Sequence, residues 1–171
     1  HLSTKGNKTA ILFEPNNPVE ETQHITYNQL HERVNRFANV LKNEGLKKGD
    51  RVCIYLPMIP DLAISVLACA RIGVIHSVVF AGFSATALST RINDSDCKIV
   101  ITSDGSYRGN KTIDLKEIVD DALNNCAGVK SVLVAKRINS EVTMKEGRDK
   151  WLQPLLNNAS SECEPEVMDA E

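Results

Sequence analysis

Two kinds of hydrophobic pattern alternate along the chain. Short runs that are apolar almost throughout occupy residues 51–56, 74–80, 98–102 and 131–135. The longer stretches between them repeat apolar residues every three or four positions, which is the spacing of one helix face. Strands of this kind, alternating with helices, are typical of a parallel sheet covered on both sides. The pattern therefore predicts an α/β fold with a mostly parallel sheet and helices on both faces.

The first 50 residues follow a different order. Residues 9–15 and 23–27 have short strand-like patterns on either side of a turn-rich segment, which predicts a hairpin. Thr26 and Gln29 have the spacing of a capping box, and a helical stripe of apolar residues follows them. We therefore expect residues 1–50 to form a leading hairpin and a helix.

Three further helices are predicted between the apolar runs. They begin at Pro60, after Ser84 and at Asp114. Glu117 stands three residues after Asp114, which is the spacing of a second capping box. Together with the apolar strands, these helices make residues 51–136 the expected βαβ core.

The pattern weakens in residues 137–171. A short helix is predicted around Trp151, and the acidic stretch after it has no pattern of its own. We interpret this part as a short helix and an acidic connector. Since the chain begins at His1 and closes on that connector, we expect it to be a piece of a longer protein.

Composition narrows the class of protein. The 171 residues carry a formal net charge of -2, which gives no reason to expect nucleic acid or an anionic membrane as a partner. No stretch has the roughly 18 consecutive apolar residues of a membrane helix, and no signal peptide is apparent. We expect a cytoplasmic protein. A piece cut from a larger domain would expose core surface, which favours self-association.

The five cysteines form no CxxC pair, and the four histidines have no metal-binding spacing. Cys53, Cys69 and Cys126 lie among apolar neighbours, so we expect reduced core residues rather than a disulfide framework. No metal site is expected in this chain.

Two loops are candidates for ligand binding, because ligands of open parallel sheets lie beyond the ends of the strands. The first is "VVFAGFSA", residues 78–85, in which Gly82 would allow close approach to the backbone and Phe80 offers an apolar face. The N-terminus of the helix after Ser84 could attract an anion. The alternative is a plain strand-to-helix turn with buried phenylalanines.

The second candidate is "TSDGSYRGNK", residues 102–111. Arg108 and Lys111 flank a glycine and an asparagine, and an arginine with a lysine suits phosphate. The two loops follow successive strands, so we expect them to lie close together. The alternative is a solvated loop whose cations serve solubility, and Asp104 could pair with either cation.

Familiar catalytic motifs are missing. The sequence contains no GxxxxGK[ST] phosphate loop, no GxGxxG fingerprint and no GxSxG elbow. His76 lies in an apolar run and is interpreted as a satisfied core histidine. Asp120 and Asp121 are interpreted as solvated residues on a polar helix face. These residues alone predict a nucleotide-sized anion site and no chemistry beyond it.

The segment from residue 50 to residue 111 resembles the acetyl-CoA synthetases, the AMP-forming acetate–CoA ligases of the adenylate-forming (ANL) enzyme superfamily. The stretches "LPMIPDLAISVLACARIGVIHSVVFAGF" and "GSYRGNK" carry the resemblance to the acetate and propionate branch. "ITYNQLHERVNRFANVLKNEGLKKGDRV" is similar to the first helix and turn of the superfamily. The resemblance covers essentially the whole chain. It implies that residues 1–171 are the first part of the large N-terminal AMP-binding domain.

The resemblance also implies a function. Such enzymes form an acyl-adenylate from a carboxylate and ATP, release pyrophosphate, and transfer the acyl group to the thiol of CoA. The implied small-molecule partners are acetate, ATP and CoA, with Mg²⁺ in the complete enzyme but no ligand for it in this chain. Two loops are implied to bind CoA, through Arg108, Gly109, Asn110, Lys111, Phe80 and Gly82.

Other parts of the family's pattern are not in these residues. The loop for the ATP phosphates, the acetate pocket and the C-terminal domain with its catalytic lysine have no counterpart here. We therefore expect no catalytic residue in this chain and no activity of the chain alone. A propionate–CoA or other short-chain acyl–CoA ligase fragment remains an alternative, as does a non-catalytic nucleotide-binding module.

Overall fold

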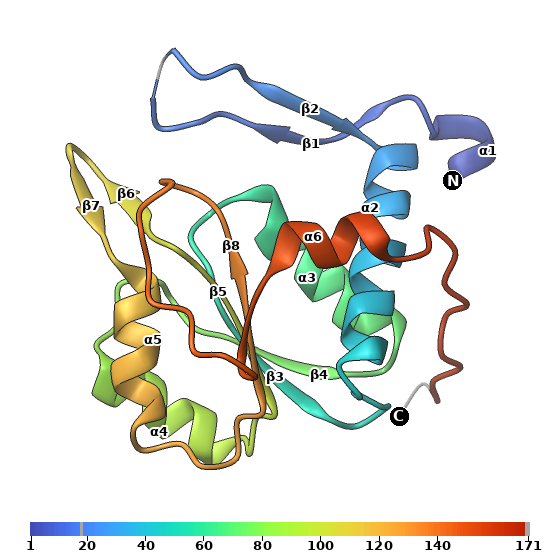
Figure 1. Ribbon diagram of the computed structural model, residues 1–171. Helices are drawn as coiled ribbons and strands as arrows, with labels where there is room; N and C mark the ends of the chain where they lie inside the picture. Colours follow the sequence, from blue (N-terminus) through green and yellow to red (C-terminus); the bar gives the residue numbers. More distant parts are fainter. Residues whose placement is uncertain (18, 170–171) are drawn as a thin grey trace.

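A five-stranded parallel sheet forms the centre of the molecule, described by a computed structural model that covers residues 1–17 and 19–169 (Figure 1). Its strands lie in the order β4-β3-β5-β8-β9, and all neighbours are parallel. They are β3 (Arg51–Tyr55), β4 (Ile75–Val78), β5 (Ile99–Ser103), β8 (Ser131–Ala135) and β9 (Asp149–Trp151). The predicted parallel α/β sheet is confirmed.

Helices cover both faces of this sheet, as predicted. One face carries α2 (Tyr27–Asn43), α3 (Pro60–Arg71) and α6 (Leu152–Asn158), and the other carries α4 (Ala85–Asp94) and α5 (Leu115–Leu123). Successive residues of a strand point to opposite faces. On β3, Val52 and Ile54 therefore pack in the first layer, whereas Cys53 and Tyr55 pack in the second.

The helices begin where local chemistry favours a start. Thr26 and Gln29 form the predicted capping box at α2, and Ser84 accepts a hydrogen bond from the Ala87 N–H at α4. Pro60 occupies the first turn of α3, where its missing N–H costs no hydrogen bond. The second predicted capping box is wrong, because the Asp114 side chain makes no capping hydrogen bond at α5.

Two hairpins stand apart from the main sheet. β1 (Thr9–Phe13) and β2 (Gln23–Thr26) form the predicted antiparallel pair, which follows a short helix α1 (Leu2–Lys5). The second hairpin joins β6 (Ser106–Arg108) and β7 (Lys111–Ile113), so the loop expected at this place is wrong. Both hairpins lie beyond the same end of the sheet in Figure 1.

The last part of the chain departs from the prediction in one respect. The helix expected around Trp151 begins only after it, since residues 149–151 pair with β8 as strand β9. Residues 159–169 form no helix or strand, but side chains of the two neighbouring helices hold them. Asn35, Arg36 and Asn39 of α2 and Arg71 of α3 donate hydrogen bonds to backbone carbonyls of this segment.

All five cysteines are free and buried, in agreement with the sequence. Burial raises the pKa of the Cys69 thiol to about 12 and that of Cys97 to about 11. Within residues 1–17 and 19–169, none of the helices is long and apolar enough to span a membrane.

Candidate functional site

The predicted site residues all lie at the carboxyl end of the sheet, the end at which its parallel strands terminate. The strand order is that of flavodoxin-like sheets, in which ligands bind where the direction of winding reverses, here between β3 and β5. The two candidate loops follow β4 and β5, and β3 lies between these strands. Two strand spacings are about 10 Å. The loops are therefore on the same end of the sheet but not on adjacent strands.

The β6–β7 hairpin presents its two cations side by side. Arg108 and Lys111 are opposite each other in the strand register, and a two-residue turn connects them. Gly109 has a φ of +59°, a conformation that favours glycine at the first turn position. Like charges placed opposite each other are unfavourable on an isolated hairpin. Both side chains are exposed, and neither forms an ion pair with any described residue.

Asp104 pairs with neither cation, contrary to one possibility that the sequence left open. Its side chain is fully buried at the end of β5, and its Oδ1 accepts three backbone N–H groups. The donors are Gly105 at 2.8 Å, Arg137 at 2.7 Å and Ile138 at 3.1 Å. Asp104 thus joins the segment after β5 to the segment after β8. The cations of the hairpin stay available.

The turn after β4 carries the other two predicted residues. Phe80 is 69% exposed, so the alternative with a buried phenylalanine at this position is wrong. A Cβ on Gly82 would lie 2.4 Å from Cε1 of Phe80, so the glycine makes room for this ring. That Gly82 also allows close approach of a ligand stays a prediction. The Phe80 and Phe83 rings meet edge to face, with centroids 6.0 Å apart.

A hydrogen bond from the sheet fixes this turn. The Tyr55 hydroxyl, on the last residue of β3, donates to the Phe83 carbonyl at 2.7 Å. The Arg91 guanidinium lies 4.8 Å from the centroid of the Phe83 ring. Phe83 is thus held from two sides, whereas Phe80 projects outward.

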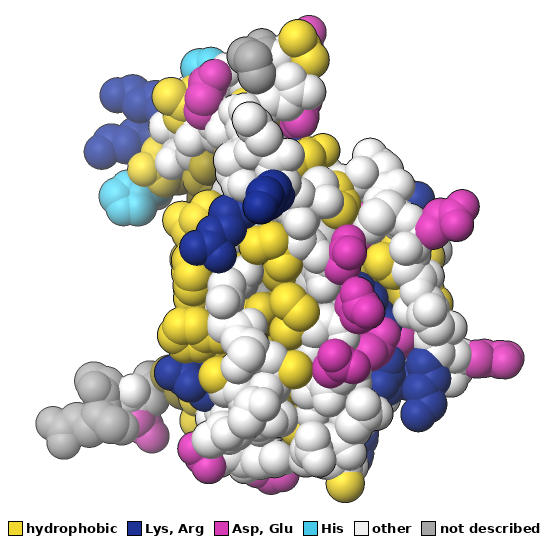
Figure 2. Space-filling view, turned by 90° about the vertical axis from the view of Figure 1, so that its left-hand side faces the viewer, with side chains coloured by type: hydrophobic (Ala, Val, Ile, Leu, Met, Phe, Trp, Pro, Cys, Tyr) yellow, Lys and Arg dark blue, Asp and Glu magenta, His cyan; other side chains and the backbone are white. Residues whose placement is uncertain are grey.

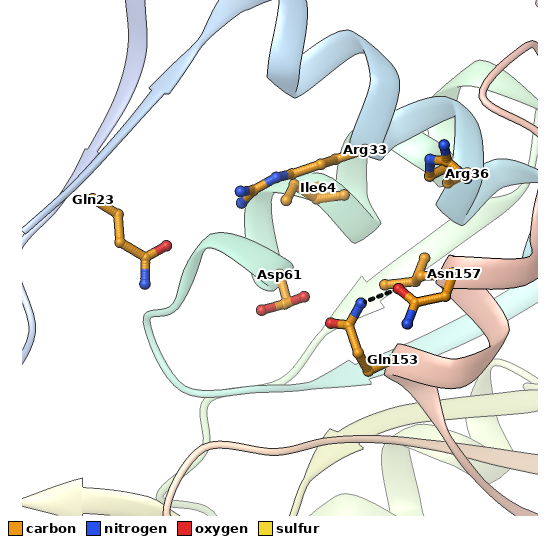
Figure 3. A pocket seen from close by; sticks show the side chains of 8 residues that line it. Gln23, Arg33, Arg36, Asp61, Ile64, Gln153 and Asn157 are labelled. Atoms are coloured by element: carbon orange, nitrogen blue, oxygen red, sulfur yellow. Dashed lines mark hydrogen bonds between the residues drawn. The ribbon is translucent and has the colours of Figure 1, made fainter.

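A pocket of about 570 Å³ opens between α2, α3, α6 and β2, and it was not predicted from the sequence (Figure 3). Arg33, Asp61 and Gln153 point into it from three helices, and Gln23 reaches it from β2. One signal could have indicated it. Asp61 opens the helix that follows β3, at the carboxyl end of the sheet where ligands gather.

Asp61 and Arg33 are two oppositely charged residues of the pocket lining. Burial raises the pKa of the Asp61 carboxyl, and its backbone hydrogen bond and the Arg33 charge offset this only in part. Neither residue forms an ion pair within the described part of the chain. The pocket therefore combines a separated positive and negative charge with amide groups.

A buried charge cluster lies on the opposite layer. Lys116 and Asp149 are almost fully buried, with Nζ and Oδ2 2.8 Å apart. Asp120 accepts from Lys116 Nζ at 2.7 Å and also pairs with Arg148, so its interpretation as a solvated residue is wrong. The network joins α5 to β9 and is satisfied internally. We assign it to structure rather than to ligand binding.

His76 and the metal-binding residues are the remaining subjects of the sequence interpretation. His76 lies half-buried on strand β4, and its Nδ1 has no hydrogen-bond partner among the described residues, so it is not a satisfied core histidine. Within the described ranges, no group of three or more His, Cys, Asp or Glu could hold a metal ion.

Figure 2 shows the face around β7, α5 and α4, on which apolar and acidic side chains are separated. Hydrophobic side chains gather over one half of that face, and acidic side chains stand together nearer the other half (Figure 2). Among the acidic residues of α5, Asp120 pairs with Lys116 and Arg148.

Comparison with known proteins decides the family. A family model described as AMP-binding enzyme matches residues 1–169. The chain belongs to this AMP-binding enzyme family. Its parallel sheet with helices on both faces is the fold that the resemblance to adenylate-forming enzymes implied.

Relatives within the family are similar over the whole chain. The chain is 56% identical over 171 residues to "Acetyl-coenzyme A synthetase" of Desulfatibacillum aliphaticivorans and 54% identical to the protein of that name from Bdellovibrio bacteriovorus. It is 50% identical to the protein of that name from Magnetococcus marinus. All 171 residues are covered in each case, and the chain spans 26% of the length of each relative.

Proposed function

We propose that this chain is the first part of the large domain of an AMP-forming acetate–CoA ligase, and that its β6–β7 hairpin binds the phosphates of CoA. The similarity to proteins named acetyl-coenzyme A synthetase, at 50–56% over all 171 residues, supports the enzyme class. The proposed reaction converts ATP, acetate and CoA to acetyl-CoA, AMP and diphosphate through an acetyl-adenylate. ATP and Mg²⁺ would be bound mainly by residues outside this chain.

One observation carries the CoA assignment. Arg108 and Lys111 are exposed, directly opposite each other and without an ion pair in the described residues. Two adjacent cations repel each other unless an anion lies between them. CoA carries a diphosphate and a 3′-phosphate, and an arginine fork beside a lysine suits such groups. Gly109 and Asn110 form the turn that keeps the two cations adjacent.

Phe80 would complete the site on the far side of β3. Its exposed ring offers a flat apolar face to the adenine of CoA, and Gly82 lets the ring fold back over the turn. The roughly 10 Å between the two loops is a distance that an extended nucleotide can span. We therefore assign phosphate binding to the hairpin and base contact to Phe80.

The division into residues 1–50, 51–136 and 137–171 stays a prediction, as do the choice of acetate over propionate and the cytoplasmic location. The non-catalytic alternative is less favoured, because the similar proteins share the name of a ligase over the full length of this chain. The pocket beside Asp61 has no assigned ligand.

The CoA assignment is tested in the full-length enzyme by replacing Arg108 and Lys111 together with alanine. Each charge-assisted hydrogen bond is worth roughly 1.5–3 kcal/mol, and less at an exposed surface. Apparent CoA affinity should therefore fall roughly tenfold to a few hundredfold. Acetate-dependent pyrophosphate exchange should be nearly unchanged, because CoA enters only in the second half-reaction. Salt should weaken wild-type binding more than mutant binding.

A matched control removes two cations from the other end of the sheet. Lys42 and Lys47 are exposed near the start of β3, and replacing both with alanine changes the net charge by the same amount. This control should keep its CoA affinity. The assignment is wrong if the hairpin variant also keeps its CoA affinity, or if it loses pyrophosphate exchange as severely as thioester formation.

A further inference from the structure

Arg137, two residues beyond β8, contacts both hairpins with one side chain. Its Cζ atom lies 5.0 Å from the ring centroid of Tyr107 in β6 and 5.7 Å from that of Phe13 in β1. Its Nη1 donates to Glu20 Oε2 at 3.0 Å, in the connection between β1 and β2. The side chain is only 11% exposed. A single guanidinium therefore stands between the β1–β2 hairpin and the β6–β7 hairpin.

The backbone of Arg137 is fixed as firmly as its side chain. Its N–H donates to Asp104 Oδ1 at 2.7 Å, and the same oxygen accepts from Gly105, where the β6–β7 hairpin begins. A Cβ on Gly105 would lie 2.8 Å from the backbone oxygen of Ile113 and 2.3 Å from Cδ1 of Ile138, so a glycine is favoured where the hairpin closes against Ile138. The root of the hairpin and the base of Arg137 therefore move together.

The β6–β7 hairpin needs such support. Each of its strands has three residues, and a two-stranded hairpin of this size is at best marginally stable in water. Its two cations oppose each other at the tip and weaken it further. A planar guanidinium stacked on Tyr107 holds the hairpin near its middle, in an orientation that a lysine could not fix in the same way.

The cations at this end of the sheet thus differ in environment. Arg137 is buried and paired with Glu20, whereas Arg108 and Lys111 are exposed and unpaired in the described residues. The Nη1 of Arg137 is paired with Glu20 and its Nη2 is buried without a hydrogen-bond partner among the described residues, so neither group faces solvent as the hairpin cations do. Its contacts are suited to holding other residues in place.

We propose that Arg137 is a positioning residue, which holds the β6–β7 hairpin in the orientation that CoA requires. This inference rests on the proposed function. Loss of Arg137 lowers the fraction of molecules in which the hairpin is correctly placed, and apparent affinity falls by that same fraction. The adenylation half-reaction does not use the hairpin and keeps its rate.

The experiment compares R137M and R137K in the full-length enzyme. R137M keeps the length of the stem but loses the charge and the fork, and should raise the KM for CoA by about three- to tenfold. R137K keeps the charge and should recover part of that loss. For both variants, acetate-dependent pyrophosphate exchange should stay unchanged. Hydrogen exchange followed by mass spectrometry should become faster in residues 105–114 in R137M, whereas β5 and β8 keep their protection.

Arg51 provides a matched control. It is a partly exposed arginine at the opposite end of the sheet, where it pairs with Asp96 and donates to the Ser95 carbonyl at 2.9 Å. R51M should change neither the KM for CoA nor exchange in residues 105–114. Should R137M fold poorly, R137K and E20Q still test the contacts, because both alter the guanidinium–carboxylate pair more gently.

The outcomes separate the two proposals. If R108A/K111A raises the KM for CoA and R137M does not, the positioning role is wrong and the CoA assignment stands. If R137M accelerates exchange in the hairpin but neither variant changes the KM for CoA, the proposed CoA site is wrong. If R137M and R51M behave alike in every measurement, Arg137 contributes only general stability and the inference is overturned.

Discussion

The two edge strands of the sheet, β9 and β4, are built in opposite ways. β9 is three residues long and charged, and its Asp149 is buried against Lys116 and Arg148. Short, charged edge strands resist pairing with other chains. β4 is four residues long and carries no Lys, Arg, Asp or Glu, and its two apolar residues stand at its exposed ends. Its Ile75 and Val78 are 58% and 51% exposed.

The register of β4 shows why its exposure is informative. Val78 lies beside Ile54 and faces the layer of α2 and α3, whereas Ile75 lies beside Arg51 and faces the other layer. A strand that is apolar on both faces is typical of the interior of a parallel sheet. β9 thus has the charged side chains of a protected edge, whereas β4 exposes one apolar residue on each face at an edge position. If the chain is part of the longer protein proposed above, we expect further residues of that protein to cover β4.

The largest effect on the free energy of unfolding should follow from removing a charge of the network at the β9 edge. K116M leaves the buried carboxylate of Asp149 with Arg148 as its remaining cation, so the loss should be about 2–3 kcal/mol, below that of a fully unpaired buried charge. Urea unfolding of the chain, followed by circular dichroism, measures this loss. Trp151 in β9 is the only tryptophan, so its fluorescence reports on the same edge.

The control for this prediction is the less buried pair of Lys98 and Asp50 at the start of the sheet, whose side chains are 36% and 14% exposed. Because solvent screens it, K98M should cost about 1 kcal/mol or less. Equal losses of unfolding free energy in K116M and K98M would show that the buried β9 network stabilises the fold no more than the less buried pair does.

Lowering the pH should have a smaller effect on the free energy of unfolding. Burial by itself would raise the pKa of Asp149, but hydrogen bonds from Arg148 and Lys116 outweigh it and hold that pKa below its usual value. A carboxyl whose pKa is lower in the folded state stabilises the fold above its unfolded pKa of about 3.9 and loses this contribution as pH falls further. The free energy of unfolding should therefore decrease below about pH 4, and D149N should flatten this decrease.

Asp50 supplies the comparison for the acid experiment. A hydrogen bond from Lys98 keeps its pKa low, so it titrates in the same direction at the other end of the strands. D50N should leave the acid response of Trp151 fluorescence in place. If D149N keeps the full wild-type pH dependence, the β9 network is not the acid-sensitive element.

The smallest effect on stability is expected at the other edge strand, β4. V78K places a charge on an exposed position of β4, so the free energy of unfolding should change by about 0.5 kcal/mol or less. Self-association of the isolated chain should nevertheless decrease, because an inserted lysine blocks pairing at an edge strand. Light scattering measures the change. L67K on the exposed surface of α3 is the control, and an equal decrease there would contradict a role for β4.

Much of the fold was predictable because it depends on local patterns. The strands at 51–55, 99–103 and 131–135 are buried on both faces, so their sequences are apolar throughout and easily recognised. β9 was missed because its residues are charged, and its place in the sheet depends on partners far away in sequence. The expected capping box at Asp114 had the correct spacing but did not form.

The candidate site was predictable in part. The cations at 108 and 111 could be identified from residue type, but their antiparallel pairing could not be distinguished from a loop, because three-residue strands give almost no pattern. Arg137 gave no local signal at all. Its contacts with Phe13, Glu20 and Tyr107 join segments up to 124 positions apart (137 − 13), which only the folded chain brings together.

The five buried cysteines allow the rate of unfolding to be followed by chemical labelling of thiols. A thiol must ionise to react with a disulfide reagent, and burial raises the pKa of Cys53, Cys69 and Cys97 while shielding them. Cys69 and Cys163 lie in the layer of α2 and α3, whereas Cys53, Cys97 and Cys126 lie in the layer of α4 and α5. Labelling at neutral pH therefore records the opening of each layer, because the identity of the labelled cysteine identifies the layer, and no cysteine has to be introduced.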